Sequence, residues 1–203
     1  MRETAFEDVF DSQRTIRTLL DVLSRPGTVG SLPHAPYQFC PPGFCPPVLS
    51  IMKTLCDHRV SFSVGSAENR QQWVRYLEVN LATPFKAVAE AEYAVFDGTV
   101  FDADFSLLSR GTLEFPETST TALISVGGLA GGAEKSADAA TTLRLSGPGV
   151  RSFAFLGVTG LDARYLEERT RANRSYPLGI DLFLVDTSGL VAGIPRTSTV
   201  EVS

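Results

Sequence analysis

A run of apolar residues late in the chain constrains the fold more than any other feature. Residues 182–185, Leu-Phe-Leu-Val, are apolar at even and odd positions alike, so a strand here has two apolar faces. Such a strand must be covered on both sides, as in the interior of a sheet. Four turn-prone residues, 186–189, follow, and then comes a second, shorter apolar run that Pro195 ends. The pattern predicts a buried β-hairpin whose first strand lies at the centre of a sheet.

Two charged residues stand at the ends of this predicted hairpin. Asp181 precedes the first apolar run and Arg196 follows the second. Because the strands of a hairpin are antiparallel, these ends lie at the same edge of the sheet and the two side chains can meet. One interpretation is a structural ion pair or a set of turn hydrogen bonds. The other is that the carboxylate orients Arg196 to hold an anion, which makes the two residues the candidate catalytic residues.

Helical and strand patterns alternate along the rest of the chain. Apolar residues at helical spacing predict a first helix, with Asp11 placed to cap it. The pair Pro46-Pro47 suits the start of a second helix, and Ser66 can cap a third that runs to about Leu81. The expected helices are 11–24, 46–56, 66–81, 105–108 and 161–173, and the expected strands are 28–32, 60–64, 93–96, 122–126, 142–145, 182–185 and 190–194.

This alternation, with one strand covered on both faces, predicts an α/β layered domain with a mixed sheet. A chain of 203 residues is long enough to bury one sizeable core, and we see no internal repeat or linker. We therefore expect a single domain over residues 1–203.

The charge balance and the apolar pattern exclude some classes of partner. The 18 Lys and Arg residues against 23 Asp and Glu give a net charge of −5, which disfavours a broad electrostatic grip on nucleic acid. No apolar run reaches the roughly 20 residues of a membrane span, and the first residues lack the pattern of an export signal. We expect a cytoplasmic protein that binds neither nucleic acid nor membranes.

A pyridoxal-phosphate enzyme needs a lysine for its Schiff base, and the chain offers three. Lys53 falls on the polar side of its predicted helix, Lys86 follows a Thr-Pro turn, and Lys135 lies in the polar stretch 133–140. None suits the role, so no such cofactor is expected. The glycines within 127–132 follow a predicted strand but match neither phosphate-loop pattern, and we interpret them as a turn into a hairpin.

Three cysteines and a histidine are the candidate metal ligands. The spacing between Cys40 and Cys45 is longer than is usual in zinc fingers, Cys56 falls at a buried helical position, and His58 would complete the set. We expect no metal and, without an export signal, reduced thiols whose role stays open. The other histidine, His34, is flanked by proline, which leaves little from which to assemble a Ser-His-Asp or Cys-His nucleophile.

Arginines crowd the end of the last predicted helix. Arg169, Arg171 and Arg174 lie there, just ahead of the hairpin. One interpretation is that these cations complement the negative end of the helix dipole. The alternative is a site for a phosphonate or triphosphate group, or for an acidic partner surface, and its candidate anion-binding residues are Arg171, Arg174 and Arg196.

Several stretches together carry a resemblance to a known family. They are Tyr-Pro-Leu-Gly-Ile-Asp-Leu at 176–182, Gly-Ile-Pro-Arg-Thr at 193–197, and residues 10–14, 25–27, 123–132 and 143–149. Nearly the whole chain resembles the PhnH family, subunits of the bacterial carbon-phosphorus lyase core complex. The resemblance implies a three-layer αβα fold with a mixed sheet, similar to the large domain of pyridoxal-phosphate-dependent transferases but without that cofactor.

The resemblance also implies a function. In that family the G, H and I subunits, with the L protein, are associated with forming ribose 1-alkylphosphonate 5-triphosphate from ATP and an alkylphosphonate. We expect a structural or regulatory subunit that binds the G, I and J subunits, forms a homodimer when isolated and has no activity by itself. The alternative is a subunit that supplies phosphate-binding or acid-base residues directly, with Asp181 and Arg196 as the first candidates.

Overall fold

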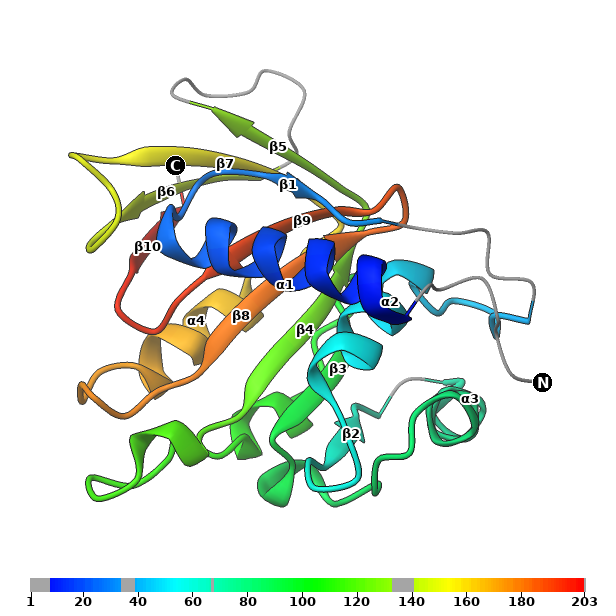
Figure 1. The fold of residues 1–203 in the computed structure, drawn as a ribbon. Coiled ribbons are helices and arrows are strands. Elements are labelled where there is room, and N and C mark those ends of the chain that lie inside the picture. The colour runs from blue at the N-terminus through cyan, green and yellow to red at the C-terminus, as the bar shows by residue number, and fades with distance from the viewer. Residues whose placement is uncertain (1–7, 34–38, 67, 133–140, 203) are drawn as a thin grey trace.

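The predicted hairpin lies inside a six-stranded mixed sheet in the computed structural model (Figure 1). The structure describes residues 8–33, 39–66, 68–132 and 141–202. His34, Lys135 and the polar stretch 133–140 therefore lie outside the described residues. Within the described ranges, none of the helices is long and apolar enough to cross a membrane.

The hairpin strand β8 lies between other strands, as predicted. The order of the sheet is β1 (Gly30–Ser31), β9 (Leu190–Ile194), β8 (Asp181–Asp186), β4 (Thr121–Val126), β3 (Tyr93–Asp97) and β2 (Phe62–Val64). Strands β2, β3, β4 and β8 run parallel, whereas β9 is antiparallel to both β8 and β1. Leu182 pairs with Ile194, and residues 182–185 are buried. The predicted central strand, the hairpin and the mixed sheet are confirmed.

Helices cover one face of this sheet. They are α1 (Asp8–Ser24), α2 (Pro46–Leu55) and, beside the β2 edge, α3 (Arg70–Asn80). Helix α1 packs against both α2 and β9, and Leu19, Val48 and Phe183 belong to one buried cluster. Pro46 and Pro47 occupy the first positions of α2, where the missing N–H groups would have no helical acceptor. The helical layer therefore forms as the sequence predicts.

The start of α3 differs from the prediction. The helix begins at Arg70, after Asn69, and has no side-chain cap. Ser66 instead donates its hydroxyl to Asp104, at 2.8 Å, and its backbone N–H to Asp102. Its side chain closes the turn after β2 and does not cap a helix, because the acidic segment that follows β3 offers it closer acceptors.

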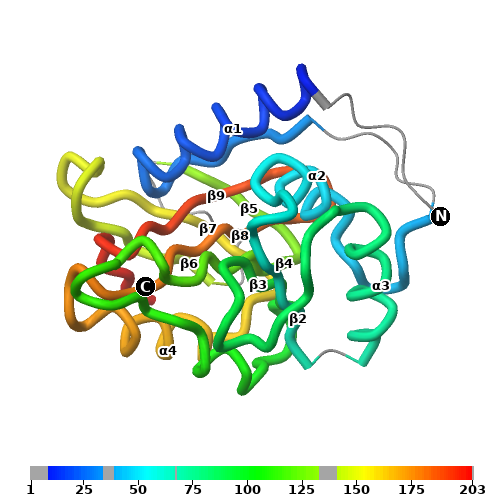
Figure 2. Tube along the Cα trace, turned by 60° about the horizontal axis from the view of Figure 1, so that its bottom comes forward, coloured from blue at the N-terminus to red at the C-terminus, as the bar shows by residue number. Residues whose placement is uncertain are grey.

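The opposite face of the six-stranded sheet is covered mainly by a second, antiparallel sheet. Its order is β10 (Thr199–Val202), β6 (Thr141–Ser146), β7 (Ala154–Thr159) and β5 (Gly128–Gly132). Helix α4 (Arg164–Ala172) lies on this side, so that α1 and α4 flank the strands from opposite sides (Figure 2). The expected αβα layering thus needs correction, because one outer layer consists of helices and the other mainly of strands.

The glycine-rich stretch in this second sheet also corrects the sequence analysis. Residues 127–132 were expected to form a turn, yet 128–132 pair with β7 as strand β5. A Cβ atom at Gly131 would approach the carbonyl oxygen of Gly27 to 3.0 Å. Small residues therefore let β5 pass close to the segment that leaves α1. Strands β7 and β10 were not among the expected strands at all.

Short 3-10 helices complete the described fold. They are η1 (Val88–Glu90), η2 (Ala103–Leu107) and η3 (Pro116–Thr118), and η2 takes the place of the short helix expected at 105–108. The ring of Phe105 packs edge-on against Phe96 and Tyr165, with centroids 5.3 and 5.0 Å away. This aromatic contact fixes α4 against the sheet, with its last turn beside the base of the hairpin.

Candidate functional site

Asp181 and Arg196 meet at the base of the β8–β9 hairpin, as the sequence predicts. Nη2 and Nε of Arg196 lie 2.6 and 3.1 Å from Oδ2 of Asp181, and the backbone N–H of Arg196 donates to Oδ1 at 2.6 Å. The side chains are only 17% and 22% exposed for Arg196 and Asp181 respectively. The ion pair and the backbone hydrogen bond together close the open end of the hairpin.

Arg196 also reaches two loops outside the hairpin. Nη1 donates to the carbonyl oxygens of Pro116, at 2.9 Å, and Pro177, at 3.5 Å, and Nη2 donates to Oγ of Ser119 at 2.5 Å. Since a guanidinium has five N–H donors, these bonds and those to Asp181 use all of them. The geometry is that of a structural clamp, and a catalytic role for either residue stays a hypothesis.

The residues just before β8 tie α4 to the hairpin. Asn173 follows α4, accepts the backbone N–H of Ile180 at 2.8 Å and donates to the carbonyl oxygen of Ile180 at 3.1 Å. Gly179 has φ +153, and a Cβ atom there would lie 2.5 Å from Oδ1 of Asn173. A side chain at this position would separate α4 from β8, which gives the glycine of the Tyr-Pro-Leu-Gly stretch a structural reason.

A cavity of about 500 Å³ lies between the last turn of α4 and the chain that leaves the hairpin. Arg174 and Arg196 both line it. Arg171 does not line it: it lines a neighbouring cavity of about 340 Å³, which Arg174 also lines, and it pairs with Glu168 at 2.7 Å. The structure thus brings together two of the three candidate anion-binding arginines, Arg174 and Arg196, whereas Arg171 pairs with the residue three positions before it.

A further arginine of the same cavity was not singled out as a binding residue. Arg169 is 1% exposed, and its Nη2 donates to the carbonyl oxygens of Pro195, at 2.5 Å, and Ser198, at 3.2 Å. Burial lowers the pKa of Arg169 to about 10, so the side chain stays charged at neutral pH. A signal existed in the sequence, since Arg169 stands four residues after Tyr165 and shares its inward helix face.

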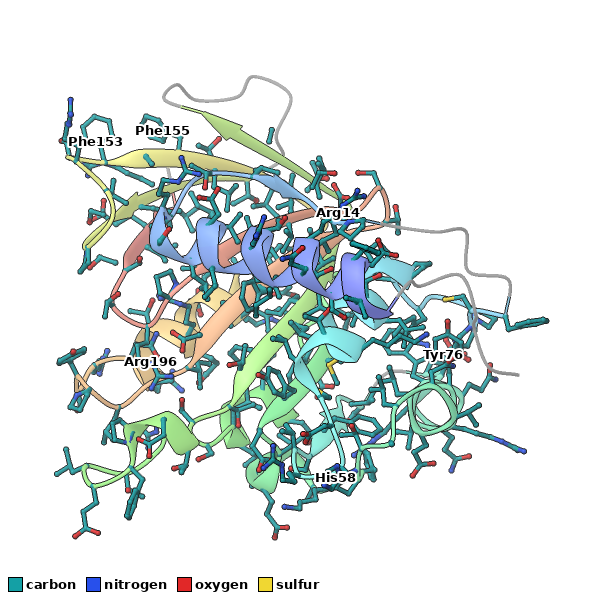
Figure 3. All side chains as sticks on the ribbon, viewed as in Figure 1. Arg14, His58, Tyr76, Phe153, Phe155 and Arg196 are labelled. Carbon is teal, nitrogen blue, oxygen red and sulfur yellow. The ribbon has the colours of Figure 1, made fainter. Side chains whose placement is uncertain are left out.

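The candidates for covalent and metal chemistry do not line the arginine-lined cavity. Burial raises the pKa of Cys45 and of Cys56 to about 12, so both thiols stay protonated at neutral pH. His58 lies well apart from Arg196 (Figure 3). Lys53 is in the last turn of α2. Within the described ranges no three His, Cys, Asp or Glu side chains gather in a group that would hold a metal ion.

The carboxyl edge of the parallel strands, where α/β sheets commonly bind ligands, carries another cavity. It measures about 510 Å³, follows β2 and β3, and is lined by Asp97, Asp102, Asp104 and Glu68. Asp102 and Asp104 are already engaged by Ser66. This acidic edge suits an anion less well than the arginine-lined cavity does.

The sequence is similar to known proteins along nearly its whole length. The family model described as "Bacterial phosphonate metabolism protein (PhnH)" matches residues 4–201. A Rhizobium meliloti (strain 1021) protein, alpha-D-ribose 1-methylphosphonate 5-triphosphate synthase subunit PhnH, is 29% identical over 201 residues, covering 97% of this chain and 94% of the relative. A Stutzerimonas stutzeri protein, putative C-P lyase subunit protein HtxG, is 30% identical over 187 residues, covering 92% and 84%.

Proposed function

The chain belongs to the PhnH family of bacterial phosphonate metabolism proteins, and from this premise we propose that it works as a subunit of a carbon-phosphorus lyase system. The observation that carries the proposal is the similarity, over 97% of this chain, to a named subunit of ribose 1-methylphosphonate 5-triphosphate synthase. The reaction it serves is formation of ribose 1-alkylphosphonate 5-triphosphate from ATP and an alkylphosphonate, together with the G, I and L components.

Within that system we propose a structural or regulatory role. Three observations on the described residues support it. All the N–H donors of the Arg196 guanidinium bond to the protein itself, and the buried thiols are protonated. His58, the histidine among the described residues, lies apart from Arg196. A site that ties loops together stabilises a surface for partners, and such a subunit needs no stand-alone activity.

The proposed partners are the G, I and J subunits and, for the isolated chain, a second copy of itself in the cytoplasm. Helix α1 offers a candidate surface, since Val9, Phe10 and Leu20 are exposed on it. Exposed apolar groups on one helix are typical of interaction surfaces. We also propose that the fold is similar to the large domain of pyridoxal-phosphate-dependent transferases.

A second candidate role is direct participation in the transfer reaction, with Asp181 and Arg196 supplying phosphate-binding or acid-base groups. The arginine-lined cavity beside this pair is the observation that favours it. In this role the pair would lie next to the reacting groups.

Co-expression with the G, I and J subunits, followed by gel filtration, tests the proposal. We expect the chain to elute with its partners, and elution by itself would contradict the subunit role. Leu20→Asp probes the α1 surface, and Leu113→Asp is its matched control, because Leu113 is also exposed but lies in a loop between η2 and η3. Only the first should impair assembly or dimerisation. Sedimentation of the wild-type chain as a 21.9 kDa species alone would exclude the homodimer.

Arg196→Ala separates the two roles. Retained assembly with loss of the nucleoside-displacement reaction favours direct participation, whereas loss of assembly favours the structural role. Far-ultraviolet circular dichroism of the isolated variant distinguishes loss of partner binding from loss of the fold.

A further inference from the structure

The arginine-lined cavity contains a buried positive charge, on Arg169, that no carboxylate of the described residues contacts. The carboxylate that acts most on Arg169 is Asp181, but the oxygens of Asp181 are engaged by Arg196. Among the described residues no carboxylate lies within ion-pairing distance of Arg169, and no Asp or Glu lines the cavity. A buried cation without a counter-ion is costly, so an anion that enters this cavity offsets a cost the fold already bears.

Two residues that line the cavity each carry a buried polar atom without a hydrogen-bond partner among the described residues. The two atoms are Nε of Arg169 and Oγ of Ser198. Arg169 is 1% and Ser198 5% exposed, and both residues line the cavity. Buried donors are nearly always satisfied in folded proteins. Both residues therefore bring to the cavity wall a donor that the described part of the chain leaves unused.

The exposed side of the cavity adds a second cation. Arg174 lines the wall, is exposed, and has no ion-pair partner among the described residues. Thr197 and Thr199 flank Ser198 on the same wall and carry further hydroxyl donors. The volume of about 500 Å³ lies in the range of small-molecule sites, roughly 300 to 1,000 Å³. There is room for an anionic group together with the organic part that carries it.

We propose that this cavity is an oxyanion-binding site that takes the phosphate or phosphonate group of a small molecule, held by Arg169, Arg174 and Ser198. Two guanidinium groups with adjoining hydroxyls match a dianion with three acceptor oxygens better than a carboxylate with two. Arg196 contributes only the cavity wall, since its donors are used elsewhere. The existence of the site rests on the cavity alone, whereas its use for phosphonates rests on the proposed function.

Titration calorimetry of the purified chain tests the site. The probes are methylphosphonate, inorganic phosphate and, as the carboxylate reference, acetate, all at one ionic strength. We expect both phosphorus anions to bind and acetate to bind at least about tenfold more weakly, the difference expected from a charge-assisted hydrogen bond. Absence of binding by both phosphorus anions at tens of millimolar, or acetate binding as tightly as they do, would overturn the proposal.

Two variants localise the binding. Arg174→Ala should weaken methylphosphonate about tenfold or more, because it removes an exposed cation that contacts the ligand. Arg171→Ala is the matched control, since it removes a cation of the same segment that lines only the neighbouring cavity and is paired with Glu168; we expect less than about a twofold change. Equal losses in both variants would mean that diffuse surface charge holds the anion, which contradicts the site.

A third variant and an assembly assay complete the test. Ser198→Ala, which removes one hydroxyl from a buried position, should weaken binding about fivefold. Assembly of Arg174→Ala with the G, I and J subunits, followed by gel filtration, should be unchanged. Failure of the wild-type chain to assemble would contradict the subunit role but not the anion site. Failure to bind anions would contradict the anion site but not the subunit role.

Discussion

Two arginine-bearing regions lie side by side at the base of the hairpin and differ in how their charges are satisfied. Arg196 is partly exposed, yet every N–H donor of its guanidinium has an acceptor and a carboxylate lies in contact. Arg169 is more deeply buried, yet it lacks a carboxylate partner within the described residues and its Nε lacks an acceptor. Burial therefore does not tell a structural arginine from a binding one. The number of donors left over does, because leftover donors are what a ligand can use.

The largest effect should come from breaking the satisfied region. Asp181→Ala leaves Arg196 without its counter-ion and frees the hairpin end, and we expect the free energy of unfolding to fall by about 3 kcal/mol. Urea unfolding measures it. Asp162→Ala removes the acidic partner of the exposed Arg164 and should cost at most about 1 kcal/mol. Similar losses in both variants would show that the hairpin pair is no more than a surface salt bridge.

A gentler change of the same region keeps the charge and removes the geometry. Arg196→Lys can still face Asp181, but an ammonium cannot reach Pro116 and Ser119 at the same time. We expect a loss of about 1.5 kcal/mol in the free energy of unfolding, with binding of methylphosphonate within about twofold of wild type. If the variant is stable but no longer binds methylphosphonate, Arg196 is a ligand-binding residue and not only a structural one.

The unsatisfied region should respond to its ligand instead. At a methylphosphonate concentration of about ten times Kd, mass action should stabilise the wild-type chain by about 1.4 kcal/mol. Urea unfolding with and without the anion measures this, and Arg174→Ala should lose most of the stabilisation. An equal gain in Arg174→Ala would assign the effect to salt at the surface.

The smallest effect should be that of Arg174→Ala without ligand. Because Arg174 is exposed and has no ion-pair partner within the described ranges, we expect the free energy of unfolding to change by no more than about 0.5 kcal/mol. A loss as large as that of Asp181→Ala would make Arg174 a structural residue and erase the contrast between the two regions.

Elements that depend on local patterns could be predicted from the sequence. The apolar run at 182–185 placed β8 inside the sheet, and antiparallel pairing then required Asp181 and Arg196 to meet. The helices α1 and α2 followed from apolar spacing and from prolines at a helix start. In each case one short segment carries the whole signal.

The second sheet depends on partners far apart in the sequence, and of its strands only β6 was expected, at 142–145. Strand β5 is Gly-Leu-Ala-Gly-Gly, whose composition is typical of a turn, and it becomes a strand because β7 supplies its hydrogen bonds. Strand β10 likewise depends on β6. Pairing with a distant strand overrides weak local propensity, and no short segment reports it.

The candidate site was predictable only in part for the same reason. The crowding of arginines near the end of α4 was visible, but which of them face one cavity depends on helix rotation and on the chain that leaves β9. Arg169 and Arg174 line it, whereas Arg171 turns to Glu168. The one sign of a buried arginine in the sequence was that Arg169 falls on the same helix face as Tyr165.

The strand order also governs when the molecule can fold during synthesis. Strand β1 pairs with β9, and β4 receives its second neighbour only when β8 arrives. Residues 181–194, which form β8 and β9 and so join β1 to β4, leave the ribosome long after β1 and β4 do. Until then β1 and one side of β4 expose unpaired backbone, and α1 lacks the strand against which it packs. We therefore expect the nascent chain to need chaperones until the β8–β9 hairpin has formed.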